Sequence, residues 1–169
     1  MDPESDAASA STSEQASTWL DADEARAWTG YRRMKGLLDL QVARDLAADS
    51  QLSDADYSVL STLGEHPAQD WRLRPLAEAL LWSPSRLAHH LSRMEQRGLI
   101  EREPHPADSR GASIGLSKTG SATIRSAAPA HVRSVRRHFL DLLNPQQLRL
   151  LSEITDTVLT HLSELPLAT

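Results

Sequence analysis

Apolar side chains recur every three or four residues between positions 21 and 49, and this spacing predicts one long helix. Asp21 followed by Glu24 is a capping-box signal for the start of that helix. A helix of this length measures roughly 40 Å. It is too long to pack wholly inside one small domain, so we expect it to pack against a partner. The apolar stripe consists of Trp28, Tyr31, Met34, Leu38, Val42 and Leu46.

The next predicted elements are short and close together. Ser53 and Asp56 form a second capping box, which begins another helix. Residues 71–73 have the aromatic and apolar composition of a short strand, and residues 76–81 are predicted to form a short helix. A tight break then leads into the following helix.

A Ser-Pro pair at the start of that helix predicts a helical segment over residues 84–97, because serine caps helices and proline suits their first turn. Its apolar face is formed by Leu87, Leu91 and Met94. Gly98 ends the helix. After it, residues 99–103 and 112–116 are predicted to pair as a β-hairpin, joined by a turn-rich loop.

Two more helices are expected after the hairpin. The first has a coiled-coil-like seam, and Pro129 is predicted to kink or break it. Asn144 and the proline after it begin the last helix. The seam consists of Ala128, Val132, Val135, Phe139 and Leu142. The apolar face of the last helix consists of Leu148, Leu151, Ile154, Val158 and Leu162.

This order of elements predicts a mainly α protein with a small β-wing. Two short helices joined by a tight turn and followed by a hairpin make a winged helix-turn-helix. We divide the chain into an acidic tail that is expected to be disordered, an N-terminal dimerisation helix, a winged helix-turn-helix lobe and C-terminal dimerisation helices. Their bounds are 1–18, 19–52, 53–118 and 119–169.

Charge is unevenly distributed along the chain, although the net charge is −5. Residues 1–24 hold seven acids and no bases, whereas residues 71–118 hold eight bases and five acids. The predicted winged lobe is therefore basic, and local charge decides which partners a surface attracts. The sequence contains no cysteine, which excludes disulfides and thiol chemistry. It has neither an apolar run of about 18 residues nor a signal-peptide pattern, so we expect a cytoplasmic protein without a membrane segment.

The polar residues of the 84–97 helix are predicted to lie off its apolar face and to meet DNA. The N-terminal end of such a helix contacts bases in the major groove, and its cap presents N–H groups to phosphate. The wing, residues 104–112, is placed to reach the adjacent minor groove. The candidate DNA-binding residues are Ser83, Ser85, Arg86, His89, His90, Arg93, Asp108 and Arg110. For the two histidines a purely solvated position stays open, and for Arg110 a simple loop ion pair with Asp108.

The stretches LAEAL, SPSRLAHHLSRMEQRGLIERE, DSRG and LSKTG resemble MarR-type transcriptional regulators over about residues 20–163. The resemblance implies a homodimer with intertwined terminal helices and one recognition helix per protomer in a major groove. It also implies a repressor that releases DNA when a small aromatic or phenolic ligand binds, and an Asp108–Arg110 pair that shapes the wing. Arg74 stands where a Ser or Thr cap is common, and His89 stands where Arg is common.

A ligand pocket is hypothesised between the dimerisation helices and the lobe. Trp28, Tyr31 and Trp71 would line it, and Arg32 or Arg33 would hold a ligand carboxylate. Ordinary core packing of the aromatic residues is the alternative interpretation. Two other functions stay open: a helical adaptor or small-molecule-binding dimer without specific DNA binding, and a metal-responsive regulator.

Enzyme and metal signatures are weak. Residues 111–115 match the GxSxG pattern, but Ser113 is predicted inside a strand rather than at a strand-to-helix turn. His131 and His138 share a helix face, whereas a metal site needs three or four ligands. We predict no catalytic residue, no metal and no cofactor.

Overall fold

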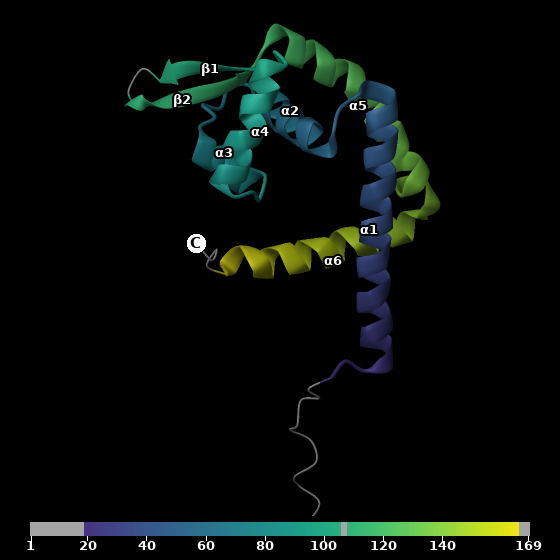
Figure 1. The fold of residues 1–169 in the computed structure, drawn as a ribbon. Helices are drawn as coiled ribbons and strands as arrows, with labels where there is room; N and C mark the ends of the chain where they lie inside the picture. The colour runs from purple at the N-terminus through teal and green to yellow at the C-terminus, as the bar shows by residue number, and fades with distance from the viewer. Residues whose placement is uncertain (1–18, 106–107, 166–169) are drawn as a thin grey trace, which may run out of the picture. The chain divides into compact units, whose positions relative to one another are not determined.

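The computed structural model describes residues 19–105 and 108–165, with the backbone alone at residues 105 and 108–111. The predicted acidic tail, residues 1–18, lies outside the described residues. Figure 1 shows the elements in chain order. They are α1 (Ala22–Ser50), α2 (Asp54–Glu65), α3 (Leu73–Ala79), α4 (Pro84–Gln96), β1 (Ile100–His105), β2 (Asp108–Leu116), α5 (Lys118–His138), the 3-10 turn η1 (Leu140–Leu142) and α6 (Pro145–Glu164).

The chain divides into two compact units, residues 1–39 and residues 40–169. The described part of the first unit is the N-terminal portion of α1. Its start is capped as predicted, because Asp21 Oδ1 accepts hydrogen bonds from the Glu24 and Asp23 amides and Glu24 accepts one from the Asp21 amide.

The second unit contains a winged lobe, α2 to β2, whose core is built from the predicted apolar faces. Leu87, Leu91 and Met94 of α4 are fully buried, and so are Val59 and Leu60 of α2. Burying a side chain of this size contributes about 1.5–3 kcal/mol, so these positions dominate the stability of the lobe. The capping boxes of α2 and α6 and the Ser83 cap of α4 form as predicted.

The β-hairpin is antiparallel and longer than expected. Ile100 pairs with Leu116 and Arg102 with Ile114, and the strands continue into the region predicted as a loop. The prediction of a strand at residues 71–73 is wrong, because α3 already begins at Leu73. Trp71 makes one strand-like contact, its carbonyl accepting a hydrogen bond from the Ile114 amide at 2.7 Å.

The helix around Pro129 is not broken, because α5 runs without interruption from Lys118 to His138. The buried face of α5 also differs from the predicted seam. Ile124, Ala127 and Ser134 are buried, whereas Val132 of the predicted seam is half exposed. The spacing of three and four residues holds for both faces, so spacing alone did not identify which one packs inward.

One corner of the lobe is held by direct backbone contact. Gly98 adopts a φ of 69°, which favours glycine, and ends the turn after α4. Ser117 Oγ donates a hydrogen bond to the Gly98 carbonyl at 2.6 Å and accepts one from the Gly120 amide. A Cβ at Gly120 would lie 1.8 Å from the Leu99 carbonyl oxygen, so only glycine fits between α5 and the start of β1.

The terminal helices keep their apolar faces exposed. No residue of α6 is buried, and Ile154, Val158 and Leu162 are all at least half exposed. In the first unit, Trp28, Tyr31 and Leu37 are exposed as well. Within residues 19–105 and 108–165, no helix combines the length and the apolar character needed to cross a membrane.

Candidate nucleic-acid interface

Helix α4 presents its polar side to solvent above its buried apolar side. Ser85, Arg86, His89 and Arg93 are all exposed. Arg86, His89 and Arg93 stand at positions i, i+3 and i+7, so they form one stripe along the helix. We call these three residues the basic stripe. Ser83 caps the helix by accepting a hydrogen bond from the Arg86 amide at 3.3 Å, which leaves other first-turn N–H groups directed outward.

The turn between α3 and α4 is tight and carries an unusual backbone. Leu81 has a φ of 55° and a side chain that is 85% exposed. Non-glycine residues rarely adopt this left-handed conformation. The next residue, Trp82, lies beneath the first turn of α4, and the Arg86 guanidinium carbon stands 4.2 Å from its ring centroid. This cation–π contact orients Arg86 before any ligand is present.

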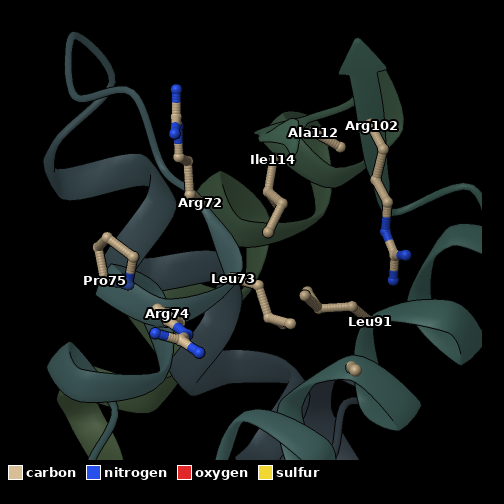
Figure 2. Close-up of a pocket in the computed structure, with 9 residues that line it drawn as sticks. Arg72, Leu73, Arg74, Pro75, Leu91, Arg102, Ala112 and Ile114 are labelled. Atoms are coloured by element: carbon tan, nitrogen blue, oxygen red, sulfur yellow. The ribbon is translucent and has the colours of Figure 1, made fainter. Parts of the chain in front are cut away.

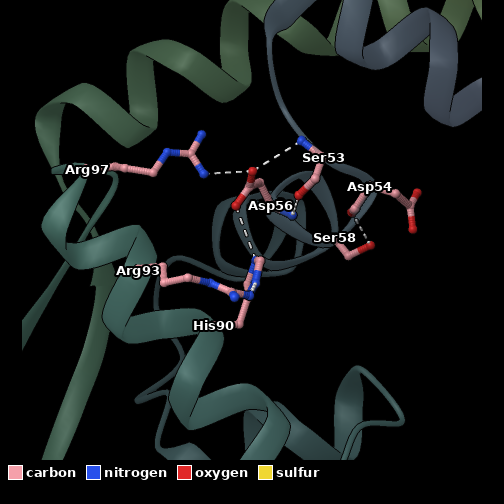
Figure 3. Close-up of polar contacts among 7 residues, drawn as sticks. All are labelled: Ser53, Asp54, Asp56, Ser58, His90, Arg93 and Arg97. Carbon is pink, nitrogen blue, oxygen red and sulfur yellow. Dashed lines mark hydrogen bonds and ion pairs between the residues drawn. The ribbon is translucent and has the colours of Figure 1, made fainter.

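His90 does not lie on the open face of α4, and that prediction is wrong. Its residue surface is only 8% exposed. Figure 3 shows the ring turned toward α2, where Nε2 lies 3.2 Å from Asp56 Oδ1. The N–H is poorly aligned with that oxygen, so the contact is electrostatic rather than a good hydrogen bond. On the other side of the ring, Arg93 Nη2 donates to Nδ1 at 3.1 Å.

Asp56 is the centre of a polar cluster between α2 and α4, which we call the Asp56 cluster: Ser53, Asp56, His90, Arg93 and Arg97. One carboxylate oxygen accepts from Arg97 Nη1 at 2.8 Å and from the Ser53 amide at 3.1 Å (Figure 3). The capping carboxylate of α2 therefore also anchors the last turn of the recognition helix. The sequence showed the cap but not the second role, because Arg97 is 41 residues away in the chain.

Burial and charge shift the titration of this cluster. Burial alone would raise the pKa of Asp56, but the hydrogen bonds from Arg97 and Ser53 hold it below its usual value. Burial also lowers the pKa of His90, although the Asp56 carboxylate opposes that shift. The cluster therefore contains a carboxylate and a neutral imidazole at pH 7.

Arg102 of β1 joins the wing to α4. Its Nε lies 3.4 Å from Glu95 Oε2, and its Nη2 lies 3.4 Å from Ser92 Oγ. The predicted wing residues Asp108 and Arg110 belong to β2, but their side chains lie outside the described residues. Their pairing with one another stays a prediction.

A cavity of about 600 Å³ lies between α3, α4 and the hairpin. Figure 2 shows Leu73 and Leu91 meeting at its floor, with Arg102 beside them. Arg72 and Arg74 also line it, and Arg72 has Asp70 as an ion-pair partner at 3.5 Å. The floor is therefore apolar, and two of the three arginines at the edge, Arg72 and Arg102, already face a carboxylate.

The predicted ligand residues fall into separate parts of the chain. Trp71 is 5% exposed and belongs to the lobe core, so the alternative interpretation of core packing holds for it. Trp28 and Tyr31 lie in the first unit, where their rings stack with centroids 6.0 Å apart. Arg32 stands 5.9 Å from the Trp28 ring. These three residues form an exposed aromatic-basic group on α1.

A Ser-His-Asp set exists between α1 and α5, but it is not arranged for catalysis. Asp45 Oδ2 accepts from Ser134 Oγ at 2.7 Å and from His138 Nε2 at 2.9 Å. In a catalytic triad the histidine stands between the serine and the carboxylate, whereas here the carboxylate stands between the other two. The Ser134 hydrogen bond chiefly lowers the pKa of Asp45. The set therefore ties α1 to α5.

Other candidate chemistry is also structural. The GxSxG serine, Ser113, lies inside β2 and donates to Asp70 Oδ1 at 2.6 Å. His131 packs against Tyr57 with ring centroids 4.1 Å apart and the ring planes tilted by 32°. Among the residues that the structure describes, no group of three histidine or carboxylate side chains is placed to hold a metal ion.

Comparison with known proteins agrees with this geometry. A sequence model described as the MarR family matches residues 52–111. The solved structure of AbsC, a MarR family transcriptional regulator from Streptomyces coelicolor, is 37% identical with a TM-score of 0.82, covering 88% of this chain and 100% of AbsC. Sco3205, from the same organism and solved in complex with DNA, is 34% identical with a TM-score of 0.80, covering 88% of this chain and 98% of Sco3205.

A curated relative points the same way. The transcriptional regulator HosA of Escherichia coli O111:H- is 28% identical over 124 residues, which are 73% of this chain and 90% of HosA. These relatives are named as regulators of transcription rather than as enzymes. The chain therefore belongs to the MarR family of transcriptional regulators and is not an enzyme.

Proposed function

We propose that this protein is a homodimeric repressor that binds a pseudo-palindromic DNA operator. The observation that carries the proposal is the basic stripe of α4, which is exposed above a fully buried apolar face. A helix of this width enters the major groove, and residues near its N-terminus then contact base edges. Sco3205, which is 34% identical, was solved bound to DNA, and this supports the same use of the fold here.

The contacts divide into those that read bases and those that hold phosphate. Ser85, Arg86 and His89 stand in the first half of α4, where base contacts are made. Ser83 and the helix N-terminus offer N–H and hydroxyl groups to phosphate. Arg93, one turn further along, is proposed to bind phosphate, which positions the protein without specifying sequence. Asp108 and Arg110 are proposed to pair in the wing, with Arg110 reaching the minor groove.

Substitutions separate these roles. Arg86→Ala is expected to cost about 1–3 kcal/mol at one base position and to relax specificity there. Equal weakening on all duplexes would assign Arg86 to phosphate instead. Arg110→Ala is expected to weaken binding through the wing, and unchanged affinity would contradict that assignment.

Dimerisation is supported by the exposed apolar faces of the terminal helices. Ile154, Val158 and Leu162 of α6 leave an apolar stripe in solvent, which soluble proteins normally cover. Pairing across a two-fold axis would cover it and would place two recognition helices about 34–36 Å apart, one turn of DNA. Such a dimer belongs in the cytoplasm, where the operator is.

Release by a small aromatic or phenolic effector is the proposed control. The cavity of about 600 Å³ beside Leu73, Leu91 and Arg102 has an apolar floor, and it lies next to α4 and the hairpin. The exposed group of Trp28, Tyr31 and Arg32 is a second candidate. A ligand lowers DNA affinity only if it binds the DNA-incompatible state more tightly.

The test is fluorescence anisotropy of the purified protein on its own upstream intergenic DNA and on a scrambled duplex, at about 0.15 M salt. A preference of about 10³-fold or more for the upstream DNA is expected. Weak and equal binding to both duplexes, followed by no enrichment of any genomic site in a pull-down, would contradict the proposal. It would favour an adaptor or a small-molecule-binding dimer.

A further inference from the structure

His90 stands apart from the rest of the basic surface because it points inward. It lies on the recognition helix, yet its ring is buried between α4 and α2. Each ring nitrogen faces a different charged residue, with Asp56 at 3.2 Å from Nε2 and Arg93 at 3.1 Å from Nδ1. Arg93 itself is exposed and belongs to the basic stripe. The imidazole therefore connects the interior of the lobe to a residue of its outer surface.

The charges around the ring determine where its proton lies. The carboxylate of Asp56 faces Nε2, so the proton of a neutral ring is most stable there. Arg93 has only donors, so Nδ1 must be the acceptor in the contact at 3.1 Å. Arg97 completes the surroundings by donating to the other oxygen of Asp56. The tautomer with its proton on Nε2 therefore accepts the hydrogen bond from Arg93 at Nδ1 and turns its N–H toward the Asp56 carboxylate, a contact that is electrostatic.

The same ring also touches the residue that orients Arg86. Trp82 meets His90 edge to face, with ring centroids 5.5 Å apart. Trp82 in turn contacts Arg86, whose guanidinium carbon lies 4.2 Å from the centroid of the Trp82 ring. Two of the three residues in the basic stripe are therefore held, directly or through one neighbour, by His90.

We propose that His90 is a positioning residue for DNA recognition: it restrains the Arg93 guanidinium, from inside the lobe, toward one phosphate of the bound duplex. The proposal rests on the proposed function, since it requires DNA binding through α4. An unrestrained arginine side chain loses considerable rotamer freedom when it binds phosphate. A guanidinium already held at Nδ1 loses less of that freedom, and this is the physical gain that His90 provides.

A double-mutant cycle on the full-length protein tests this coupling. The variants are Arg93→Gln, His90→Leu and the pair together, with DNA affinity measured as a function of salt. His90→Gln is the rescue variant, because its amide supplies an NH2 donor group and a carbonyl acceptor. His131→Leu is the control, since it removes a different histidine, which is half buried and contacts Tyr57 of α2.

We expect Arg93→Gln to weaken binding about tenfold and to reduce the salt slope by about 0.9, as loss of one phosphate contact requires. His90→Leu should weaken binding about three- to fivefold and reduce the slope partly, although it removes no surface charge. The double variant should bind about as well as Arg93→Gln alone. His90→Gln should recover most of the affinity, and His131→Leu should leave it unchanged.

Three results would overturn the role of His90 while leaving the proposed DNA-binding function intact. Additive penalties in the double variant would mean that His90 acts only on folding. Nitrogen-15 NMR of the wild-type histidines reports the tautomer without any substitution, so it serves even if His90→Leu does not fold. A proton on Nδ1 of neutral His90 would exclude the contact with Arg93, and an unaltered Nδ1 resonance in Arg93→Gln would do the same. A wild-type protein without preference for any duplex would instead refute the DNA-binding function and this inference with it.

Discussion

The winged lobe and helix α6 show the same apolar spacing and opposite burial. Leu87, Leu91 and Met94 of α4 are fully buried, whereas Ile154 of α6 is 61% exposed and Leu159 is 62% exposed. Both helices have a capped start and a proline in the first turn. The spacing of apolar residues thus predicts that a helix has an apolar face, but it does not say whether that face is covered by the same chain or by another copy.

The largest expected effect is on stability, and it separates the buried apolar face of α4 from the exposed apolar face of α6. Leu91→Ala should lower the free energy of unfolding by about 4 kcal/mol, because it removes packing from the core and leaves a cavity. Ile154→Ala, the matched substitution in α6, should cost an isolated chain less than about 0.5 kcal/mol. Urea denaturation at low protein concentration measures both. Equal losses would mean that α6 packs on its own chain.

A charged residue on α6 tests whether its exposed apolar face forms the dimer interface. Ile154→Asp should abolish the dimer in sedimentation experiments while the lobe keeps its fold by circular dichroism, because the carboxylate would be buried without a partner at the interface. A variant that still sediments as a dimer would place the interface elsewhere.

The third prediction concerns the corner where α5 meets β1. Gly120→Ala should lower the free energy of unfolding by about 3 kcal/mol, because the new Cβ collides with backbone rather than with a flexible side chain. Gly64→Ala is the control. A Cβ at Gly64 meets Leu116 at an ordinary 3.7 Å, so a gain of up to about 1 kcal/mol is expected there. Thermal unfolding of both variants measures the contrast, and a stable Gly120→Ala protein would refute the close contact.

The fourth prediction tests the Asp56 cluster. Asp56→Ala should lower the free energy of unfolding by about 2 kcal/mol, because it removes a helix cap and leaves Arg97 without its buried partner. Asp54→Ala changes an exposed acid two residues earlier on the same helix. It should cost less than about 0.5 kcal/mol. Comparable losses in denaturant titrations would mean that Asp56 acts only as another first-turn acid.

A smaller and opposite effect is expected at the turn before the recognition helix. Leu81→Gly should raise the free energy of unfolding by up to about 1 kcal/mol, because glycine adopts a positive φ without steric strain and the leucine side chain is exposed. Gly98→Ala is the opposite change, because it puts a Cβ on a residue with a φ of 69°, and it should destabilise the lobe by about 1 kcal/mol. Melting temperatures that move in the same direction for both variants would contradict this account.

The smallest effect is expected from mild acid. Burial lowers the pKa of His90 and of His131 below the usual value of about 6.5. The unfolded chain therefore binds protons first, and stability should be complete above pH 6.5 and should decrease as the pH falls toward the folded pKa values. The carboxylates Asp45 and Asp56, whose pKa values are lowered, act only below about pH 4. Urea titrations at pH 7.5 and 5.5 should show that His90→Gln loses less unfolding free energy between these pH values than the wild type. Identical losses would mean that His90 does not contribute to the pH dependence of stability.

The sequence predicted the helices and hairpin well wherever local signals agreed. Ser53, Ser83 and Asn144 each combined a cap with an apolar face, and each begins a helix. It failed at residues 71–73, because strand-like composition is a weak signal when a proline two residues later can sit in a helical first turn. Pro129 was expected to interrupt α5, but a single proline removes only one hydrogen bond from a helix that is otherwise packed.

The candidate interface was predicted less completely than the fold. The spacing of the apolar residues predicted that the polar residues of α4 lie off its buried face, and this holds for Ser85, Arg86, His89 and Arg93, which are all exposed. It wrongly placed His90 on the open face, because its partner Asp56 is far away in the sequence. The contact of Asp45 with Ser134 likewise joins residues 89 positions apart. Such pairs become visible only when the chain is folded.

The backbone contact at Gly120 has a mechanical consequence. No layer of side chains separates the start of α5 from the Leu99 carbonyl, and Ser117 bridges the same junction to Gly98. The end of α4 and the first turn of α5 must therefore move together as one rigid unit. Reorientation of the recognition helix has to be absorbed further along α5. Pro129 marks the place where bending meets the least resistance, since its ring leaves the carbonyl of residue 125 without a helical donor.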